Sequence, residues 1–362
     1  MILLRPDTLT CHGIRLELFG NLDAVGSEWR ALAAQTRNIF ATWEFASIWW
    51  RHFGKNRPLR IICCRSADDR LIAILPLYQW SSSPLRVIRF LGHGPGDRLG
   101  PICAPADYPI AIEALRLAFS IQFFKWDVFL GERLIASEPC GSALSGRTLV
   151  REGYPIVRLS YKSWDEFLAS RSVHFRGTVR RFERKLVRER NLSYRALCHT
   201  SLNEDLDTVF ALHDALWKGC PSSFFRAHEA FHREFAACAQ ARGWLRIWFL
   251  ELDGKSAAAW LGFRFGDAEF SYQGGRDIAW ERYSVGLVLF MHTIREALQD
   301  GMTEYLFLRG GEKYKYRLAD YDPGIETFGL AKGVFPQNLL AAAAALRHPD
   351  RRFRLDVATF LR

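Results

Sequence analysis

The sequence predicts an α/β (α+β) protein of two tandem domains, each a mixed, mostly antiparallel sheet flanked by helices. One observation is a repeated order of strand and helix patterns, offset by about 180 residues. The other is size, because 362 residues with 49% hydrophobic content can form two hydrophobic cores. We expect a first domain over residues 1–150, a second over 151–334 and a helical tail over 335–362.

The second half carries the clearer pattern. Three β-prone runs separated by hairpin turns predict a meander at residues 245–252, 257–265 and 269–273. A helix should begin at Ser284, which can serve as its N-cap, because apolar residues then recur with helical spacing at Leu287, Met291, Ile294 and Leu298. Gly301 ends that helix, and residues 303–308 return as a strand.

The first half repeats this order. Strands are predicted at residues 59–65, 71–80 and 87–91, followed by a glycine-rich loop, a helix over 111–120 and a strand over 126–130. No glycine opens the helix near Ala111, whereas Gly286 does so in the second half. This difference indicates that the first domain is the degenerate copy of the two.

Charge and cysteine usage limit the function classes. The formal net charge of +10 favours anionic partners such as a nucleotide-bearing cofactor, a nucleic acid or an acidic membrane surface. No apolar run is long enough to span a bilayer, and no secretion signal is recognisable, so a cytoplasmic protein is expected. The eight cysteines show no C-x-x-C pair, which disfavours a zinc knuckle or redox dithiol and favours buried thiols.

A family resemblance is carried by the second half. The run Tyr283-Ser284-Val285-Gly286-Leu287 opens a helix and is followed by Phe307-Leu308-Arg309-Gly310 and then Tyr314-Lys315. With Pro76-Leu77 and Phe90-Leu91-Gly92, these residues resemble the acetyltransferase family of bacterial cellulose and exopolysaccharide synthesis, a branch of the GNAT acyltransferases. The tandem layout is also similar to that of the Fem aminoacyltransferases. Two positions differ: Val285 replaces the usual proline, and Leu306 replaces the usual acid.

The resemblance implies transfer of an acetyl or other acyl group from acyl-CoA to an amine or hydroxyl acceptor, with no metal. Backbone N–H groups near Tyr272 and Gln273 would polarise the thioester carbonyl. Asp277 or Glu312 would act as base, and Tyr314 would protonate the departing thiolate. For Asp277, a turn or capping role is an equally good interpretation.

The donor's pyrophosphate has an expected position that follows from physical reasoning. A helix N-terminus after a strand offers backbone N–H groups and the positive end of a dipole. Ser284, Val285, Gly286 and Leu287 form that N-terminus, with Arg282 just upstream as a phosphate partner. Arg309, Gly310 and Lys315 complete the expected donor contacts, although a solvated salt bridge would also explain Arg309 and Lys315. An ordinary capped helix is the alternative for the whole segment.

A basic helix is predicted over residues 173–190. Phe175, Val179, Phe182 and Leu186 would form its buried stripe, and an arginine ridge recurs at Arg176, Arg180, Arg184 and Arg188. Such a ridge is usually a solvated face. Its functional interpretations are a track for cofactor phosphates, for an acidic glycan, or for tRNA if the donor is an aminoacyl-tRNA as in Fem enzymes.

Two other function classes remain open. His228-Glu229-Ala230-Phe231-His232 matches the H-E-x-x-H zinc-protease signature, with Glu251 as a conceivable third ligand, but Glu251 falls in a strand-like run. A non-catalytic scaffold of a polysaccharide-secreting complex is the other class. The acceptor, the acyl chain length and the oligomeric state do not follow from the sequence.

Overall fold

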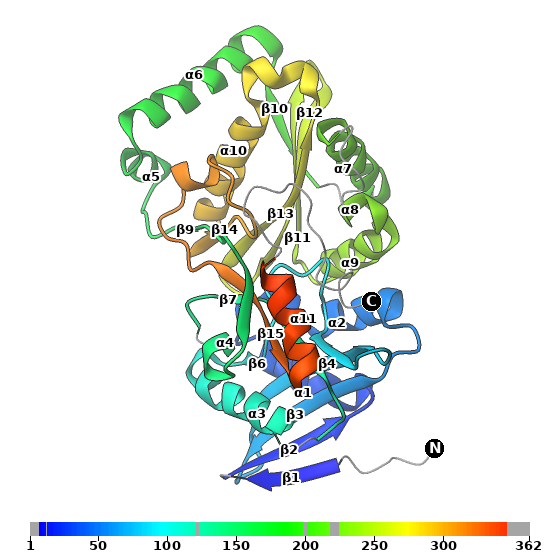
Figure 1. The fold of residues 1–362 in the computed structure, drawn as a ribbon. Coiled ribbons are helices and arrows are strands. Elements are labelled where there is room, and N and C mark those ends of the chain that lie inside the picture. The colour runs from blue at the N-terminus through cyan, green and yellow to red at the C-terminus, as the bar shows by residue number, and fades with distance from the viewer. Residues whose placement is uncertain are drawn as a thin grey trace. The chain divides into compact units, whose positions relative to one another are not determined.

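The computed structural model describes residues 7–11, 13–120, 123–138, 140–197, 201–217 and 224–345. The described chain divides into two compact units (Figure 1). Unit 1 comprises residues 1–152 and 323–362, and unit 2 comprises residues 153–322. No helix among the described residues is both long and apolar enough to span a membrane.

Unit 1 is built on one twisted sheet with strand order β1-β2-β3-β4-β5-β7-β15-β8 and a short β6 beside β4. The strands are β1 (Asp7–Cys11), β2 (Ile14–Phe19), β3 (Leu59–Ser66), β4 (Leu71–Ser81), β5 (Val87–Phe90), β6 (Ile102–Cys103), β7 (Val128–Ile135), β8 (Arg147–Glu152) and β15 (Ile325–Ala331). Its helices are α1 (Gly26–Ala33), α2 (Trp43–Trp49), α3 (Tyr108–Ser120), α4 (Cys140–Ala143) and α11 (Val334–Ala345). The predicted elements of the first half are all present.

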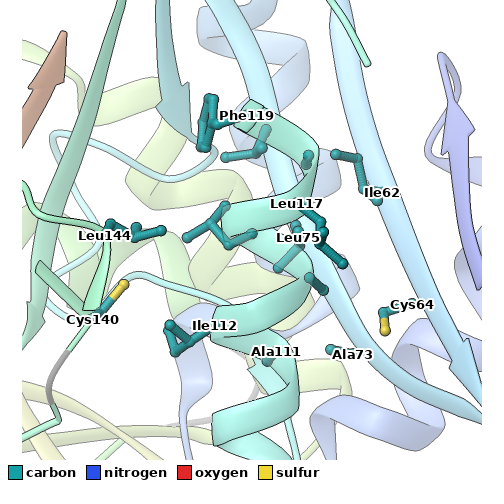
Figure 2. Close-up of a cluster of buried hydrophobic side chains, with 14 of the residues drawn as sticks. Ile62, Cys64, Ala73, Leu75, Ala111, Ile112, Leu117, Phe119, Cys140 and Leu144 are labelled. Carbon is teal, nitrogen blue, oxygen red and sulfur yellow. The ribbon is translucent and has the colours of Figure 1, made fainter. Parts of the chain in front are cut away.

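The core of unit 1 lies between the sheet and α3. Figure 2 shows Leu117 and Phe119 of α3 among side chains of β3 and β4, with Cys140 and Leu144 at one side. Burial raises the thiol pKa of four cysteines to about 12, so they stay protonated and unreactive: Cys63, Cys64, Cys103 and Cys140. The prediction of buried thiols is confirmed for these four. Cys198 and Cys220, and the side chain of Cys11, lie outside the described part.

Unit 2 has a second sheet, with order β10-β11-β12-β13-β14-β9. Its strands are β9 (Ile156–Arg158), β10 (Ser193–Ala196), β11 (Leu245–Leu252), β12 (Lys255–Phe265), β13 (Ala268–Arg276) and β14 (Glu304–Leu306). Its helices are α5 (Trp164–Ala169), α6 (Val173–Arg190), α7 (Leu202–Leu216), α8 (Phe224–Ala227), α9 (Glu229–Ala241) and α10 (Val285–Gln299), with the 3-10 segment η5 (Ile278–Tyr283) before α10.

The helices of unit 2 cover both faces of its sheet. Helices α6 and α10 share a core with Trp260 of β12 and Tyr305 of β14, while α7 and α9 pack on the other face (Figure 1). On α10 the buried residues include Val288, Met291 and Ile294, whereas Leu287 is only half-buried. The predicted meander, the basic helix and the helix predicted from Ser284 are therefore present. The buried apolar stripe of α10 is shifted by part of a turn from the predicted one.

The domain limits differ from the predicted ones at the C-terminal side. Strand β15 inserts between β7 and β8 of the unit 1 sheet, with Ile325 opposite both Ile135 and Glu152. Residues 323–334 therefore belong to unit 1, although the sequence assigned them to the second domain. The tail helix α11 begins at Val334, and residues 346–362 lie outside the described part.

Candidate active site

The central strand of unit 2 carries a β-bulge. In the antiparallel pairing of β12 with β13, Leu261 lies opposite Gln273 and Gly262 lies opposite Ser271. Tyr272 is therefore the extra residue on β13. A bulge interrupts the ladder and bends the strand, which re-aims backbone groups at that point. Tyr272 and Gln273, the two residues at this irregularity, are those whose N–H groups the family resemblance implies for polarising the thioester carbonyl.

The same strand separates from its parallel neighbour at the bulge. Strands β13 and β14 pair only from Ala268 opposite Glu304 to Phe270 opposite Leu306. Strand β14 then ends, whereas β13 continues to Arg276, so no β14 residue lies opposite residues 271–276. Half of one edge of a central strand is thus left without a strand neighbour, which gives an extended ligand a backbone edge to pair with.

The N-terminus of α10 follows β13 through η5. Ser284 takes the N-cap position with a left-handed backbone (φ 52°), and its side chain makes no capping hydrogen bond. Its carbonyl accepts the N–H of Val288 at 3.1 Å. Within the described chain the backbone N–H groups of Val285, Gly286 and Leu287 have no acceptor. Three N–H groups and the positive dipole end are thus available to an anion.

Arg276 extends this anion site. A Cβ placed on Gly286 would lie 3.6 Å from Arg276 Cδ, an ordinary contact, so nothing in the protein requires glycine there. The ion pair of Arg276 with Glu281 is long, with 3.5 Å between the guanidinium nitrogen and the carboxylate oxygen. A cation beside a helix N-terminus opposes the helix dipole. An anionic ligand bound at this helix N-terminus would explain both the position of Arg276 and the glycine at position 286. Arg276 was not among the residues predicted from the sequence, although its place at the end of the third strand could have pointed to it.

The loop after β14 brings Tyr314 to the same side of the sheet as α10. Its ring lies 5.4 Å from Phe290 of α10 and 6.3 Å from Phe307, while 36% of the residue stays exposed. Burial and then the charge of Glu312 raise the pKa of Tyr314, whereas Arg276 lowers it. Tyr314 therefore keeps its proton at neutral pH and lies within electrostatic reach of Arg276.

The neighbouring residues of this loop stabilise it. Lys315 is buried; its Nζ donates to the carbonyl of Arg309 and pairs with Glu312, each at 2.9 Å. Gly310 has φ 130°, and a Cβ there would overlap the Glu312 carboxylate. Lys315 and Gly310 thus fix the loop's conformation.

Asp277 and Arg282 have local partners. The carboxylate of Asp277 accepts the N–H of Ala279 at 2.9 Å and caps η5, the alternative already considered for it. The guanidinium of Arg282 lies over the ring of Tyr283, 4.9 Å from its centroid, and donates to the Tyr283 hydroxyl at 3.3 Å.

The residues of the zinc-protease signature are engaged in other contacts. His228 is the N-cap residue of α9, and Glu229 forms ion pairs with Arg226 and Arg233. The buried ring of His232 lies 4.6 Å from Phe225 and 5.8 Å from Tyr272. The part of the chain that the structure describes contains no group of three His, Cys, Asp or Glu side chains arranged to hold a metal ion.

Comparison with known families identifies unit 2. Residues 173–316, all inside unit 2, match the acetyltransferase (GNAT) domain family. The match covers α6 to the Tyr314 loop, including β13 and α10. The chain therefore carries a GNAT-type acetyltransferase domain, and the predicted acyltransferase class is confirmed. No curated protein matches the sequence.

Solved structures agree with the fold of both units. The chain is similar to a FemX crystal structure at TM-score 0.62 and 11% identity, covering 88% of this chain and 98% of that one. It is similar to the C-terminal domain of a putative lysylphosphatidylglycerol synthetase from Agrobacterium fabrum at TM-score 0.56 and 10% identity, covering 90% and 95%. A tandem GNAT protein of clavulanic acid biosynthesis matches at TM-score 0.50 and 10% identity, covering 89% and 99%. The predicted tandem GNAT fold is confirmed.

Proposed function

We propose that unit 2 transfers an acetyl or other acyl group from an acyl-CoA thioester to an amine or hydroxyl acceptor. One observation carries this proposal: β13 runs past the end of β14 toward an α10 N-terminus with unpartnered N–H groups and Arg276 beside it. The donor's pantetheine arm would lie along residues 271–276, and its pyrophosphate would accept from Val285, Gly286 and Leu287.

The chemistry needs few protein groups. The acceptor nucleophile attacks the thioester carbon, and backbone N–H groups at Tyr272 and Gln273 stabilise the negative charge on its oxygen. The C–S bond then breaks, and the departing thiolate takes the proton of Tyr314, whose raised pKa keeps that proton bound until it is needed.

Glu312 remains the candidate base that receives the acceptor's proton. It forms an ion pair with Lys315 at 2.9 Å, on the loop that carries Tyr314. Asp277 is a weaker candidate, because its carboxylate already accepts the Ala279 N–H. Among the remaining donor candidates, Arg282 and Ser284 lie on the approach to α10, whereas Arg309 and Gly310 belong to the loop that carries Tyr314.

Unit 1, by this proposal, binds no acyl donor. Its strands β5 and β7 pair in parallel only as far as Arg89 opposite Leu130. Beyond that point Leu99 donates its N–H to the carbonyl of Arg133 at 3.0 Å, and Arg133 donates to the carbonyl of Gly94 at 2.6 Å. In unit 1, therefore, β5 ends first and the protein's own glycine-rich loop lies along the continuing β7, unlike the open edge of β13 in unit 2, which supports a degenerate first domain. We propose that this domain helps to bind the acceptor.

The biological setting follows from resemblance. The similarity to the cellulose and exopolysaccharide acetyltransferases favours a glycan-related acceptor in the cytoplasm. A Fem-like donor, aminoacyl-tRNA, is the second candidate, favoured by the exposed arginines of α6. A non-catalytic scaffold of a polysaccharide-secreting complex is the third candidate function.

Calorimetric titration with acetyl-CoA and longer acyl-CoAs tests the donor site. In Gly286→Trp the indole would fill the space at the α10 N-terminus, so binding should be lost. Gly177→Trp is the matched control, because Gly177 is also a helical glycine of unit 2 and has nothing within 4 Å of its Cβ direction. Equal binding by both variants would refute the proposed site, and no binding by the unmodified protein would favour a tRNA donor or a scaffold.

A further inference from the structure

Helix α6 presents one outward face without an acidic residue. On an 18-residue helix the residues that point away from the buried stripe share one side. This face, called here the α6 face, consists of exposed residues only: Val173, His174, Gly177, Arg180, Arg181, Arg184, Val187 and Arg188. The two glutamates of α6 lie beside it: Glu183 faces Arg295 at 3.8 Å, and Glu189 accepts from Tyr283 at 3.3 Å.

The positive charge of the α6 face is largely unneutralised within the described chain. Arg180 approaches Asp165 of α5 at 3.5 Å, but that carboxylate is 87% exposed. Arg188 pairs with its neighbour Glu189 and stays 77% exposed. Arg181 lies over the ring of Phe182, and Arg184 donates to a backbone carbonyl of its own helix. Exposed pairs of this kind contribute little, so the face attracts anions.

Apolar and small residues interrupt the charge. Val173 is 75% exposed and Val187 is 61% exposed, one near each end of a helix roughly 27 Å long. Valine and glycine are poor helix formers, and an exposed mid-helix glycine weakens a helix with no compensation from packing. A solvated ridge would favour alanine, lysine or glutamate at these positions. Their presence indicates a surface shaped for contact.

We propose that the α6 face docks on an anionic lipid bilayer. Arginines at the level of the headgroups pair with lipid phosphates, and each contributes a roughly fivefold gain in binding near such a surface. The valines reach the apolar edge of the headgroup layer, while Gly177 keeps the centre of the face flat. Polynucleotide phosphates would match the arginines but would leave both valines without an apolar partner. The lipid surface therefore accounts for more of the face.

Docking would leave the buried side of α6 in place. Phe175, Val179 and Leu186 stay in the core of unit 2, so α6 lies on the surface without inserting. Lys185, on the flank, lies 4.7 Å from the ring of Tyr283 in η5, the segment that leads into α10. The docking face and the proposed donor site are thus on neighbouring elements, but neither depends on the other.

Vesicle flotation with the full chain tests the proposal. The probes are phosphatidylcholine vesicles with graded fractions of phosphatidylglycerol. We expect binding that rises with phosphatidylglycerol and falls with salt. Arg180→Gln with Arg184→Gln should weaken binding about 25-fold, from about fivefold per arginine. Arg70→Gln with Arg116→Gln removes the same charge from exposed positions of unit 1 and should change it little.

Val187→Ser separates the possible partners. It keeps every charge, so it should weaken vesicle binding severalfold while leaving any binding of bulk tRNA unchanged. Absence of phosphatidylglycerol-dependent binding, or equal binding by the α6 and control variants, would overturn the proposal. So would loss of tRNA binding, but not vesicle binding, in the α6 variant, which would assign the face to RNA. Calorimetric acetyl-CoA binding is a separate readout, so either proposal can fail alone.

Discussion

Acid should destabilise unit 2 through His292, a buried histidine of α10. Its ring stacks on Tyr194 at 3.8 Å between centroids and meets the edge of Trp248 at 4.5 Å. Arg295 donates to its Nδ1 at 3.0 Å, so a second positive charge would be created beside the first on protonation. Burial, and then Arg295, lower the pKa of His292 from 6.5 to about 4, although Glu296 lies 3.9 Å away.

The sign of the effect follows from the two pKa values. In the unfolded chain the pKa of His292 is 6.5, so the unfolded chain binds a proton there as pH falls below that value. The folded chain does not bind this proton until pH approaches 4. The contribution of His292 is therefore fully present above 6.5 and is lost between these values. The shift corresponds to a loss of about 2 kcal/mol at pH 5 relative to pH 7.5. Allowing for solvent at the ring edge, we expect about 1.5 kcal/mol.

Urea unfolding of the protein and of His292→Phe, at both pH values, measures this loss. Phenylalanine keeps the stack on Tyr194 and cannot titrate. The stability of the protein relative to the variant should therefore fall by about 1.5 kcal/mol between the two pH values, because other titrating groups cancel in the difference. His174→Gln, a substitution at an exposed position, is the control for replacing a histidine elsewhere in unit 2. A difference that stays constant with pH would refute the reasoning.

Four further outcomes test the site. Arg276→Gln should weaken acetyl-CoA binding by roughly 10- to 100-fold, the range for a hydrogen bond to a charged group, in calorimetric titration with an unchanged melting temperature. Tyr314→Phe should lower thiol release from acetyl-CoA about 100-fold while leaving donor affinity unchanged, and loss of affinity would contradict a proton-transfer role. Asp277→Ala should cost about 1 kcal/mol in unfolding free energy, and a large fall in turnover would restore it as the base. Gly275→Ala should destabilise by about 1–3 kcal/mol, since its Cβ would overlap the backbone of His213; an unchanged melting curve would refute this packing.

Local sequence patterns were sufficient to predict many of the helices and strands of unit 2. The helix over residues 173–190 follows from apolar residues that recur with a period near 3.6, and α6 has those limits. The meander follows from turn residues between β-prone runs. Both patterns involve residues that are close in sequence, so both can be recognised from one sequence alone.

The remaining features depend on residues far apart in the chain. Strand β15 is a seven-residue run whose partners, β7 and β8, lie more than 170 residues earlier, and no local pattern records that pairing. The left-handed turn at Ser284 and the helix-terminal place of Arg276 depend on how η5 joins β13 to α10. Asp277 was assigned two roles from sequence, and only its hydrogen bond to Ala279 distinguishes the capping one.

The position of β15 has a consequence for the order of events during synthesis. Strands β7 and β8 leave the ribosome early, but the strand that joins them is made only after all of residues 153–322. Domains generally fold as units in the order in which they emerge. Here unit 2, though later in sequence, is complete first, while the nascent unit 1 sheet has a missing strand between two exposed edges. Chaperone dependence and aggregation during expression should therefore arise from the first half of the chain.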